Sequence, residues 1–303
     1  MTRHLHQPAV LELAPEERVR GLLTPSHLQQ ALMLLACNGY VILRGALPRT
    51  LVDEMHDAYS AIVAECLASA PGKSSDDLPW RSAGDTVFWI INARLRAFVR
   101  LTGPFADPRV VANPSALAVL RQTLGPGLFC NSVSSDTCLQ GSVFQSPHRD
   151  IGFYAGRSAP GTIVNIPLMH CGPQNGPLQV WPGGSHLWGA ELFARFGIRA
   201  FDQDTDNPAM EAFVRDIPSL ALDLHPGDVL LRDPGMLHRG TPNTTPEPRS
   251  MLTIGYFRAG QRYEFGHPEY NLTPSAFEAL HPHVKALVRQ RYLAWTGSAV
   301  IRR

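Results

Sequence analysis

His148 and Asp150 are separated by one residue, so on a β-strand their side chains would lie on the same face. An imidazole and a carboxylate in this arrangement could bind one metal ion without distorting the backbone. The spacing alone is weak evidence, because 12 histidines and 26 acidic residues in a chain of this length produce about one such pair by chance. A second pair, His267 and Glu269, is indeed present.

His238 distinguishes the two pairs. It follows an apolar strand that begins after a predicted turn at residues 226–228, and it could return to His148 if the strands wind as a barrel. Two imidazoles and one carboxylate leave three positions on an octahedral metal open, which suits Fe(II) and oxygen chemistry. The residues after His267 follow a helical pattern, so we interpret that pair as structural.

Arg249 follows His238 by eleven residues and opens the last apolar strand. A guanidinium that points into an apolar barrel needs an anion, and a carboxylate can accept both arms of its fork. The sequence therefore predicts a binding site for a carboxylate near the metal.

These residues are part of a longer series of motifs that resembles the phytanoyl-CoA dioxygenase family of Fe(II)/2-oxoglutarate-dependent oxygenases. The resemblance extends over roughly residues 24–260. It is carried by the order and spacing of segments 39–45, 148–150, 175–186, 226–231 and 238–243, followed by Arg249.

The resemblance implies a site for Fe(II), O2 and the cosubstrate 2-oxoglutarate, whose far carboxylate would meet Arg249. Iron would be held by His148, Asp150 and His238. The resemblance also implies further polar residues that hold the cosubstrate, and the expected ones here are Asn131, Ser135 and Thr162. Many relatives in the wider superfamily carry Ser or Thr two residues after the arginine, where this chain has Met251. The second donor to the far carboxylate is therefore left open.

Other side chains receive structural interpretations. His186 could be a fourth ligand, but similar family members use this segment as a turn. His170, His225 and His283 have no carboxylate partner at a suggestive spacing, so we expect them to be hydrogen-bonded or exposed. Phe88, Trp89 and Ile91 could line a substrate pocket, although an aromatic run is more often part of a core.

The elements that position these residues change in character along the chain. Short apolar stretches separated by turn residues fill residues 127–260, which predicts a sandwich or barrel of strands. Together with the resemblance, this indicates an α+β fold: a double-stranded β-helix (jelly-roll or cupin-like barrel) flanked by N-terminal and C-terminal helices. We expect a single domain over 1–303, with a helical part at 1–125, the β core at 127–260 and a closing helix at 273–295.

Helical patterns dominate the first third. Thr24 can cap a helix that begins at Pro25 and ends at Gly39, and a second periodic run extends from Pro48 to Cys66. A further helix is expected at 115–124, and residues 71–85 are expected to form a polar, mobile loop. One short strand, 40–43, separates the first two helices.

Composition narrows the classes of function. Lys plus Arg (27) nearly equals Asp plus Glu (26), so nucleic acid is not an expected partner. Five cysteines without a Cys-x-x-Cys pair suggest neither a disulfide framework nor a thiolate zinc site. The first residues do not resemble a signal peptide, and no apolar run is long enough to span a membrane, so a cytoplasmic protein without a membrane partner is expected.

The combined expectation is an Fe(II)/2-oxoglutarate-dependent dioxygenase. It would hydroxylate or otherwise oxidise a C–H bond of a small molecule, with a natural-product intermediate favoured as substrate, and release succinate and CO2. One alternative is a cupin-like isomerase or hydrolase that uses the metal without 2-oxoglutarate. The other is a binding protein with no catalytic activity. The sequence leaves the oligomeric state open.

Overall fold

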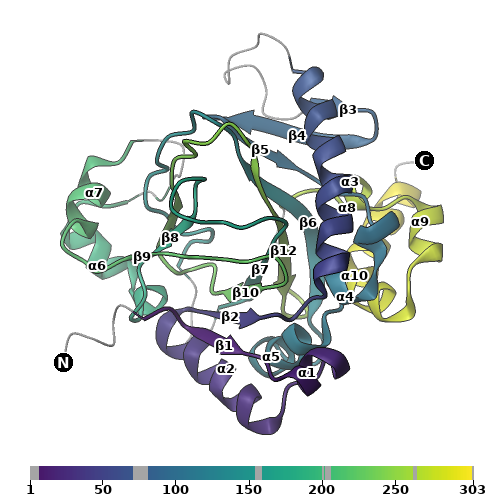
Figure 1. The fold of residues 1–303 in the computed structure, drawn as a ribbon, viewed down its shortest axis with the longest axis horizontal. Helices are drawn as coiled ribbons and strands as arrows, with labels where there is room; N and C mark the ends of the chain where they lie inside the picture. Colours follow the sequence, from purple (N-terminus) through teal and green to yellow (C-terminus); the bar gives the residue numbers. More distant parts are fainter. Residues whose placement is uncertain are drawn as a thin grey trace.

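The computed structural model describes residues 7–70, 81–153, 159–199, 201, 206–261 and 265–301. Most of the loop expected at 71–85 lies outside these residues. Within them the fold is mixed α+β, with a large sheet, a small sheet and several helices (Figure 1). The expected α+β class is therefore confirmed.

A nine-stranded sheet forms the centre of the fold and carries strands from both the helical part and the β core. Its longest pairings are antiparallel and join β12 to both β6 and β7. In spatial order the strands are β1 (Val10–Glu12), β2 (Tyr40–Arg44), β10 (Val229–Arg232), β7 (Gly161–Pro167), β12 (Arg249–Phe257), β6 (Phe129–Cys138), β5 (Arg94–Ala97), β4 (Thr86–Ile91) and β3 (Arg81–Ala83). The second sheet contains β11 (His238–Gly240), β8 (Leu178–Val180) and β9 (Leu220–Ala221).

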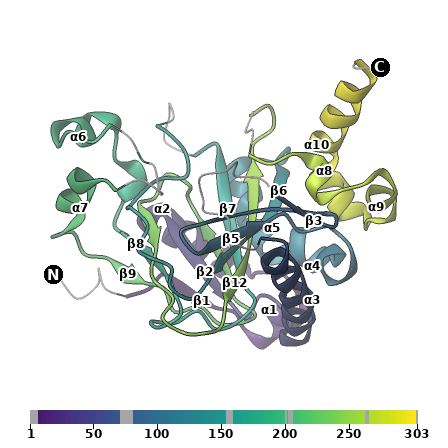
Figure 2. The ribbon, with the colours of Figure 1, turned by 90° about the horizontal axis from the view of Figure 1, so that it is seen from above.

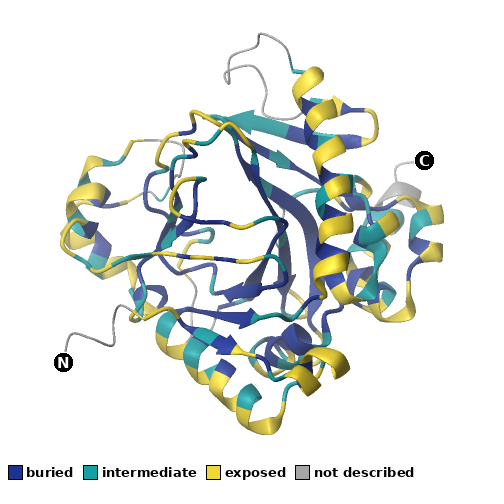
Figure 3. Ribbon diagram, in the orientation of Figure 1, coloured by how far each residue is buried: buried dark blue, intermediate teal, exposed yellow. Residues whose placement is uncertain are grey.

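The two faces of the large sheet pack against different partners. Because side chains alternate along a strand, Leu252 and Ile254 of β12 join the main core on one face, whereas Met251 points to the other. Met251 belongs to a cluster that also contains Leu178 and Val180 of the small sheet. We call the face that carries Met251 the inner face. Figure 3 shows both sheets as largely buried.

Three of the expected helices are confirmed. In α2 (Pro25–Asn38) the Thr24 hydroxyl accepts a hydrogen bond from the His27 amide at 3.2 Å, and Gly39 ends the helix with φ 78°. Helices α3 (Arg49–Ala68) and α5 (Pro114–Leu124) lie where periodicity predicted them. The first third also contains β3, β4 and β5, which sequence reasoning did not predict. β3 and β5 are short and contain basic residues, whereas the apolar and aromatic residues of β4 were interpreted as core or as the lining of a pocket.

The closing helix is two helices rather than one. α9 (Pro274–Ala279) ends at Leu280, which is extended, and α10 (Pro282–Ile301) begins at a proline. A proline disfavours helical backbone at the residue before it, so the helical pattern is interrupted at His281. Figure 2 shows α10 extending to the C-terminus at the edge of the molecule. The shorter helices are α1 (Pro15–Arg20), α4 (Pro108–Val111), α6 (Ala190–Arg195), α7 (Pro208–Val214) and α8 (Pro268–Asn271), with 3-10 turns at Gly103–Ala106 and Ser185–Leu187.

Among the described residues, none of the helices has both the length and the apolar character that crossing a membrane requires.

Glu17 connects α1 to the start of α2. Its carboxylate is almost fully buried and accepts hydrogen bonds from the amides of Thr24 at 2.6 Å and Ala14 at 2.9 Å, and it contacts His27 Nδ1 at 2.6 Å. Burial by itself would raise the pKa of Glu17, but these hydrogen bonds outweigh it and lower the pKa from 4.5 to about 2. The ionised form of Glu17 therefore stabilises the folded protein.

Replacing Glu17 with glutamine should reduce the free energy of unfolding at pH 7 by on the order of 3 kcal/mol, because the charged acceptor is lost. Because the pKa of Glu17 is lowered on folding, its carboxylate stabilises the fold fully at pH values above 4.5, and this stabilisation is lost as the pH falls toward 2. The difference in unfolding free energy between the Glu17→Gln variant and the unsubstituted protein should therefore more than halve at about pH 3. Urea unfolding followed by circular dichroism measures both values. The exposed neighbour substitution Glu16→Gln is the control, and an equal loss at both pH values for Glu17→Gln would contradict the assignment.

Candidate active site

His148 and His238 are placed side by side by a backbone bridge. The amide of His148 donates to the His238 carbonyl at 2.9 Å, and the amide of His238 donates back at 3.1 Å. His238 begins β11, which pairs with β8. The bridge puts both buried imidazoles on one face, with ring centroids 4.3 Å apart.

One nitrogen of each imidazole lies within hydrogen-bond distance of a backbone carbonyl. Nδ1 of His148 lies 2.9 Å from the Ser146 carbonyl, and Nδ1 of His238 lies 2.9 Å from the Met236 carbonyl. Because a carbonyl can only accept, each Nδ1 carries a proton, which leaves Nε2 as the nitrogen of each ring that can bind a metal. Burial and the neighbouring His238 lower the pKa of His148 to about 3, so His148 is neutral near pH 7.

Asp150 completes the cluster. Its Oδ1 lies 3.3 Å from His238 Nε2 and 3.8 Å from His148 Nε2, and the three potential ligand atoms lie within 4.8 Å of one another. Oδ2 forms an ion pair with Arg232 Nη1 at 2.5 Å. Burial alone would raise the pKa of Asp150, but Arg232 and the two imidazoles hold it well below its usual value. The donor set is thus two imidazoles and one carboxylate, which suits a divalent first-row metal.

Arg232 was not found by sequence reasoning, although an arginine that ends an apolar strand could have signalled an inward-facing cation. Its Nε donates to Asn165 Oδ1 at 3.2 Å, and Asn165 Nδ2 donates to Thr253 Oγ1 at 3.0 Å. These residues lie on β10, β7 and β12, which are neighbours in the large sheet. A polar chain therefore crosses the inner face from Asp150, beside a cavity of about 40 Å³ lined by Arg96, Ser132, Ser134, Asp150, Ile163, Arg232, Thr253, Gly255 and Phe265.

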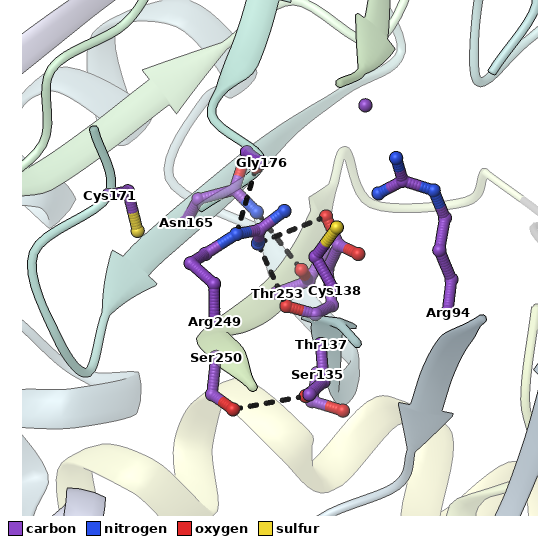
Figure 4. Close-up of polar contacts among 12 residues, drawn as sticks. Arg94, Ser135, Thr137, Cys138, Asn165, Cys171, Gly176, Arg249, Ser250 and Thr253 are labelled. Carbon is purple, nitrogen blue, oxygen red and sulfur yellow. Dashed lines mark hydrogen bonds and ion pairs between the residues drawn. The ribbon is translucent and has the colours of Figure 1, made fainter. Parts of the chain in front are cut away.

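Arg249 is fully buried on the inner face (Figure 4). Its Nε donates to the Gly176 carbonyl at 3.0 Å, and its Nη1 donates to the Asp136 carbonyl at 3.0 Å and lies 3.6 Å from Asp136 Oδ2. Nη2 is buried and has no hydrogen-bond partner among the residues that the structure describes. An unsatisfied buried guanidinium nitrogen costs free energy unless an acceptor reaches it, so this atom marks room for an anion.

Arg94 is a second buried guanidinium that sequence reasoning missed. Arg94 on β5 and Arg249 on β12 both pair with Cys138 on β6, so the two arginines flank one position of the sheet (Figure 4). Nη2 of Arg94 donates to the Thr241 carbonyl at 2.8 Å and the Val143 carbonyl at 3.1 Å. Its Nε and Nη1 are buried, and no described residue offers them a hydrogen bond. The sequence signal was the alternation of Arg94 and Arg96, which puts both on one face of a short strand.

Asp136 lies among these cations. Burial would raise the pKa of its carboxyl, but Arg249, Arg94 and Arg96 together lower it, so Asp136 is ionised. Asp136 and Asp150 are the carboxylates placed against Arg94, Arg96, Arg232 and Arg249, so these arginines outnumber them on the inner face. The region around Arg249 is therefore suited to a further anionic group.

The three polar residues expected to hold a cosubstrate do not join this cluster. Ser135 points to the outer face, where its hydroxyl accepts hydrogen bonds from Tyr59 and from the Ala97 amide. Asn131 lies opposite a register shift in β12, donates to the Phe265 carbonyl and lines a different cavity. Thr162 lines a cavity beside α2 and α5. The expectation chose the correct strand for Ser135 but the wrong face, because inward positions on β6 are 132, 134 and 136.

The remaining candidate residues lie outside the His148–Asp150–His238 cluster. His186 lies outside the cluster, and its Nε2 contacts the Ala36 carbonyl at 3.1 Å. His267 Nδ1 lies 3.5 Å from Glu269, and within the described residues no third metal-ligating group joins this pair. Phe88 is buried in the main core, whereas Trp89 packs against Phe98 and Phe265.

His170 and His225 are exposed and make hydrogen bonds, as expected. The absence of a carboxylate partner was wrong, because both Nε2 atoms lie near Asp223, at 2.6 Å and 3.3 Å. Asp223 lies two residues before His225, a spacing that sequence reasoning overlooked, whereas 53 residues separate it from His170.

Comparisons with known proteins agree with this architecture. A sequence model described as phytanoyl-CoA dioxygenase matches residues 35–251, more than two thirds of the chain. Among solved structures, EvdMO1 has a TM-score of 0.54 and 17% identity over 77% of this chain, but the chain spans only 50% of EvdMO1. AviO1 from Streptomyces viridochromogenes Tue57 has a TM-score of 0.54 and 17% identity, covering 78% of this chain and 96% of AviO1.

A third structure is SnoN, described as a non-heme alpha ketoglutarate-dependent epimerase from nogalamycin biosynthesis. Its TM-score is 0.52 at 21% identity, covering 78% of this chain and 82% of SnoN. SnoN has also been solved in complex with Fe3+, alpha ketoglutarate and nogalamycin RO, with a TM-score of 0.53 to this chain at 19% identity and coverage of 78% and 85%. At these identities the likeness shows a shared fold.

Proposed function

This chain belongs to the phytanoyl-CoA dioxygenase family, and from that premise and the His148–Asp150–His238 cluster we propose that it is a non-haem Fe(II)- and 2-oxoglutarate-dependent oxygenase. We read its two sheets as a double-stranded β-helix, and residues 1–303 as one oxygenase domain. The observation that carries the proposal is the convergence of two buried imidazoles and one ionised carboxylate, with potential ligand atoms within 4.8 Å of one another.

The residues present fit both groups. His148, Asp150 and His238 would hold Fe(II), because the two Nε2 lone pairs and Asp150 Oδ1 face one another. The orphaned Nη2 of Arg249 would receive the far carboxylate of 2-oxoglutarate. We propose Arg94 as a second cation for that carboxylate, at the point where Met251 offers no hydroxyl. Asn131, Ser135 and Thr162 are left out of this set because of their positions.

When bound, iron and 2-oxoglutarate supply oxidative chemistry with O2 that acts on a C–H bond and releases succinate and CO2. The chain's own residues contribute positioning. The backbone carbonyls of Ser146 and Met236 fix the tautomer of each imidazole, and Arg232 orients Asp150 so that Oδ1 faces the histidines. Burial of the imidazoles limits the access of water.

Arg249 argues against one rival function, and the cluster of metal-ligand atoms argues against the other. A cupin-like isomerase or hydrolase would use the metal as a Lewis acid and has no need of Arg249 Nη2. A binding protein would not require three potential metal-ligand atoms within 4.8 Å of one another. We favour a small natural-product intermediate as substrate.

A screen of candidate molecules for stimulated succinate release, after anaerobic Fe(II) loading and exposure to oxygen, tests the proposed oxygenase function. No succinate above the level of a His148→Ala control would overturn it.

The type of product gives a further prediction. In related halogenases an alanine or glycine replaces the carboxylate and chloride takes the vacated position, whereas Asp150 fills that position here. We expect mass spectrometry of products formed in high chloride to show oxygen insertion, loss of two hydrogens or an isomer of unchanged mass, and no chlorine. A chlorinated product from the unsubstituted protein would refute this prediction.

A further inference from the structure

His170, Asp223 and His225 form a second cluster, outside the proposed iron site, which we call the surface cluster. Their potential ligand atoms all lie within 4.8 Å of one another. The carboxylate is shared, because Oδ1 of Asp223 lies 2.6 Å from His170 Nε2 and Oδ2 lies 3.3 Å from His225 Nε2. The side chains remain about half exposed, at 52%, 60% and 46% in chain order, so an ion in solution could reach them.

The backbone pre-organises the surface cluster. Cys171 and Leu224 form an antiparallel bridge in which each amide donates to the other's carbonyl, at 2.8 Å and 3.1 Å. Both of these side chains are fully buried in the cluster on the inner face that contains Met251. Because side chains alternate along extended backbone, their neighbours at 170, 223 and 225 point to the opposite side, toward solvent. The arrangement is therefore set by hydrogen-bonded backbone and not by flexible surface side chains.

Gly172 gives the His170 ring its space. A Cβ at this position would lie 2.6 Å from Cε1 of His170, which is closer than real contacts allow. Without that atom, the imidazole stacks on His225, with ring centroids 4.8 Å apart and planes 30° apart. Both rings thus present Nε2 to the same carboxylate.

From this geometry we propose that the surface cluster is a second metal site, which binds a divalent first-row transition ion such as Zn²⁺, Ni²⁺ or Cu²⁺. Two imidazoles and one carboxylate favour these ions over Mg²⁺ and Ca²⁺, which prefer oxygen ligands. The ion would replace the present contacts between the two imidazoles and Asp223 with bonds to the same nitrogen and oxygen atoms. It would also join segments that are 53 residues apart in sequence and thereby stabilise the fold.

Isothermal titration with Zn²⁺ tests the site independently of the proposed oxygenase function. Tag-free protein with His148→Ala and His238→Ala lacks both imidazoles of the iron site, and it should still bind one equivalent. Adding His225→Ala should weaken that binding by at least ~10-fold, since even partners outside the ligand set change metal affinity by this amount. Adding His267→Ala, from the exposed pair with Glu269, is the matched control and should have no effect.

Two further measurements guard against a variant that simply fails to fold. In otherwise unsubstituted protein, Gly172→Ala removes no ligand but displaces the His170 ring, and it should weaken the surface site without changing the circular dichroism spectrum. Cu²⁺ bound to the double variant should show the electron paramagnetic resonance signature of two nitrogen ligands. Absence of Zn²⁺ binding in the double variant, or equal affinity after His225→Ala, would overturn the proposal.

Discussion

Replacing His148 or His238 with alanine is expected to abolish stoichiometric Fe(II) binding and turnover. Each substitution removes one of the two imidazole nitrogens that face Asp150 Oδ1, and the remaining pair of ligands cannot hold the ion firmly. Anaerobic titration with Fe(II), followed by metal analysis of the desalted protein, measures the stoichiometry. His267→Ala should behave as the unsubstituted protein does, because Glu269 is its one metal-ligating neighbour among the described residues.

Asp150→Ala should have the same effect on iron, with an additional cost in stability. It leaves the Arg232 guanidinium without the carboxylate 2.5 Å away, and an uncompensated buried charge of this kind destabilises by about 3 kcal/mol or more. Thermal unfolding of the metal-free variants separates this cost from the loss of metal, and the histidine variants are the cleaner test of ligation. Full iron occupancy in any one of the three variants would show that the cluster is not the metal site.

Arg249→Ala is expected to weaken 2-oxoglutarate binding by at least ~30-fold and to leave Fe(II) binding intact. Without the guanidinium, the far carboxylate of the cosubstrate would lie in a buried site without the donor that Nη2 offers, a loss on the order of 2 to 5 kcal/mol. Arg249→Lys should recover only part of the affinity, because an ammonium cannot reproduce both the contact to the Gly176 carbonyl and the contact to the cosubstrate.

The measurement is a titration of 2-oxoglutarate into anaerobic Fe(II) protein, followed by the metal-to-ligand charge-transfer band. Iron content measured on the same samples is the internal control, since Arg249 is not a proposed ligand. Unchanged affinity in the alanine variant would assign Arg249 a purely structural role beside Asp136. Absence of the band in the unsubstituted protein would favour the cupin-like alternative.

Local features of the chain could be predicted because their causes are local. The Thr24 cap, the proline that follows it and the glycine at 39 act within a few residues, so the bounds of α2 follow from them. In the same way, the two-residue spacing of His148 and Asp150 indicates a shared face before any fold is known. Arg249 could be predicted to need an anion, since a cation that opens an apolar strand has few other uses.

Strand faces and long-range partners depended on the tertiary structure. A change of register by one residue reverses which side chains point inward. The sequence therefore could not predict that Ser135 lies on the outer face of the sheet, or that Asn131 lies opposite a register shift in β12.

Arg232 meets Asp150, and Asp223 meets His170, only because segments far apart in the sequence become neighbours in the folded chain. The sequence by itself therefore determined which residue types were available for chemistry. The pairing of the strands decided which of those residues share a site.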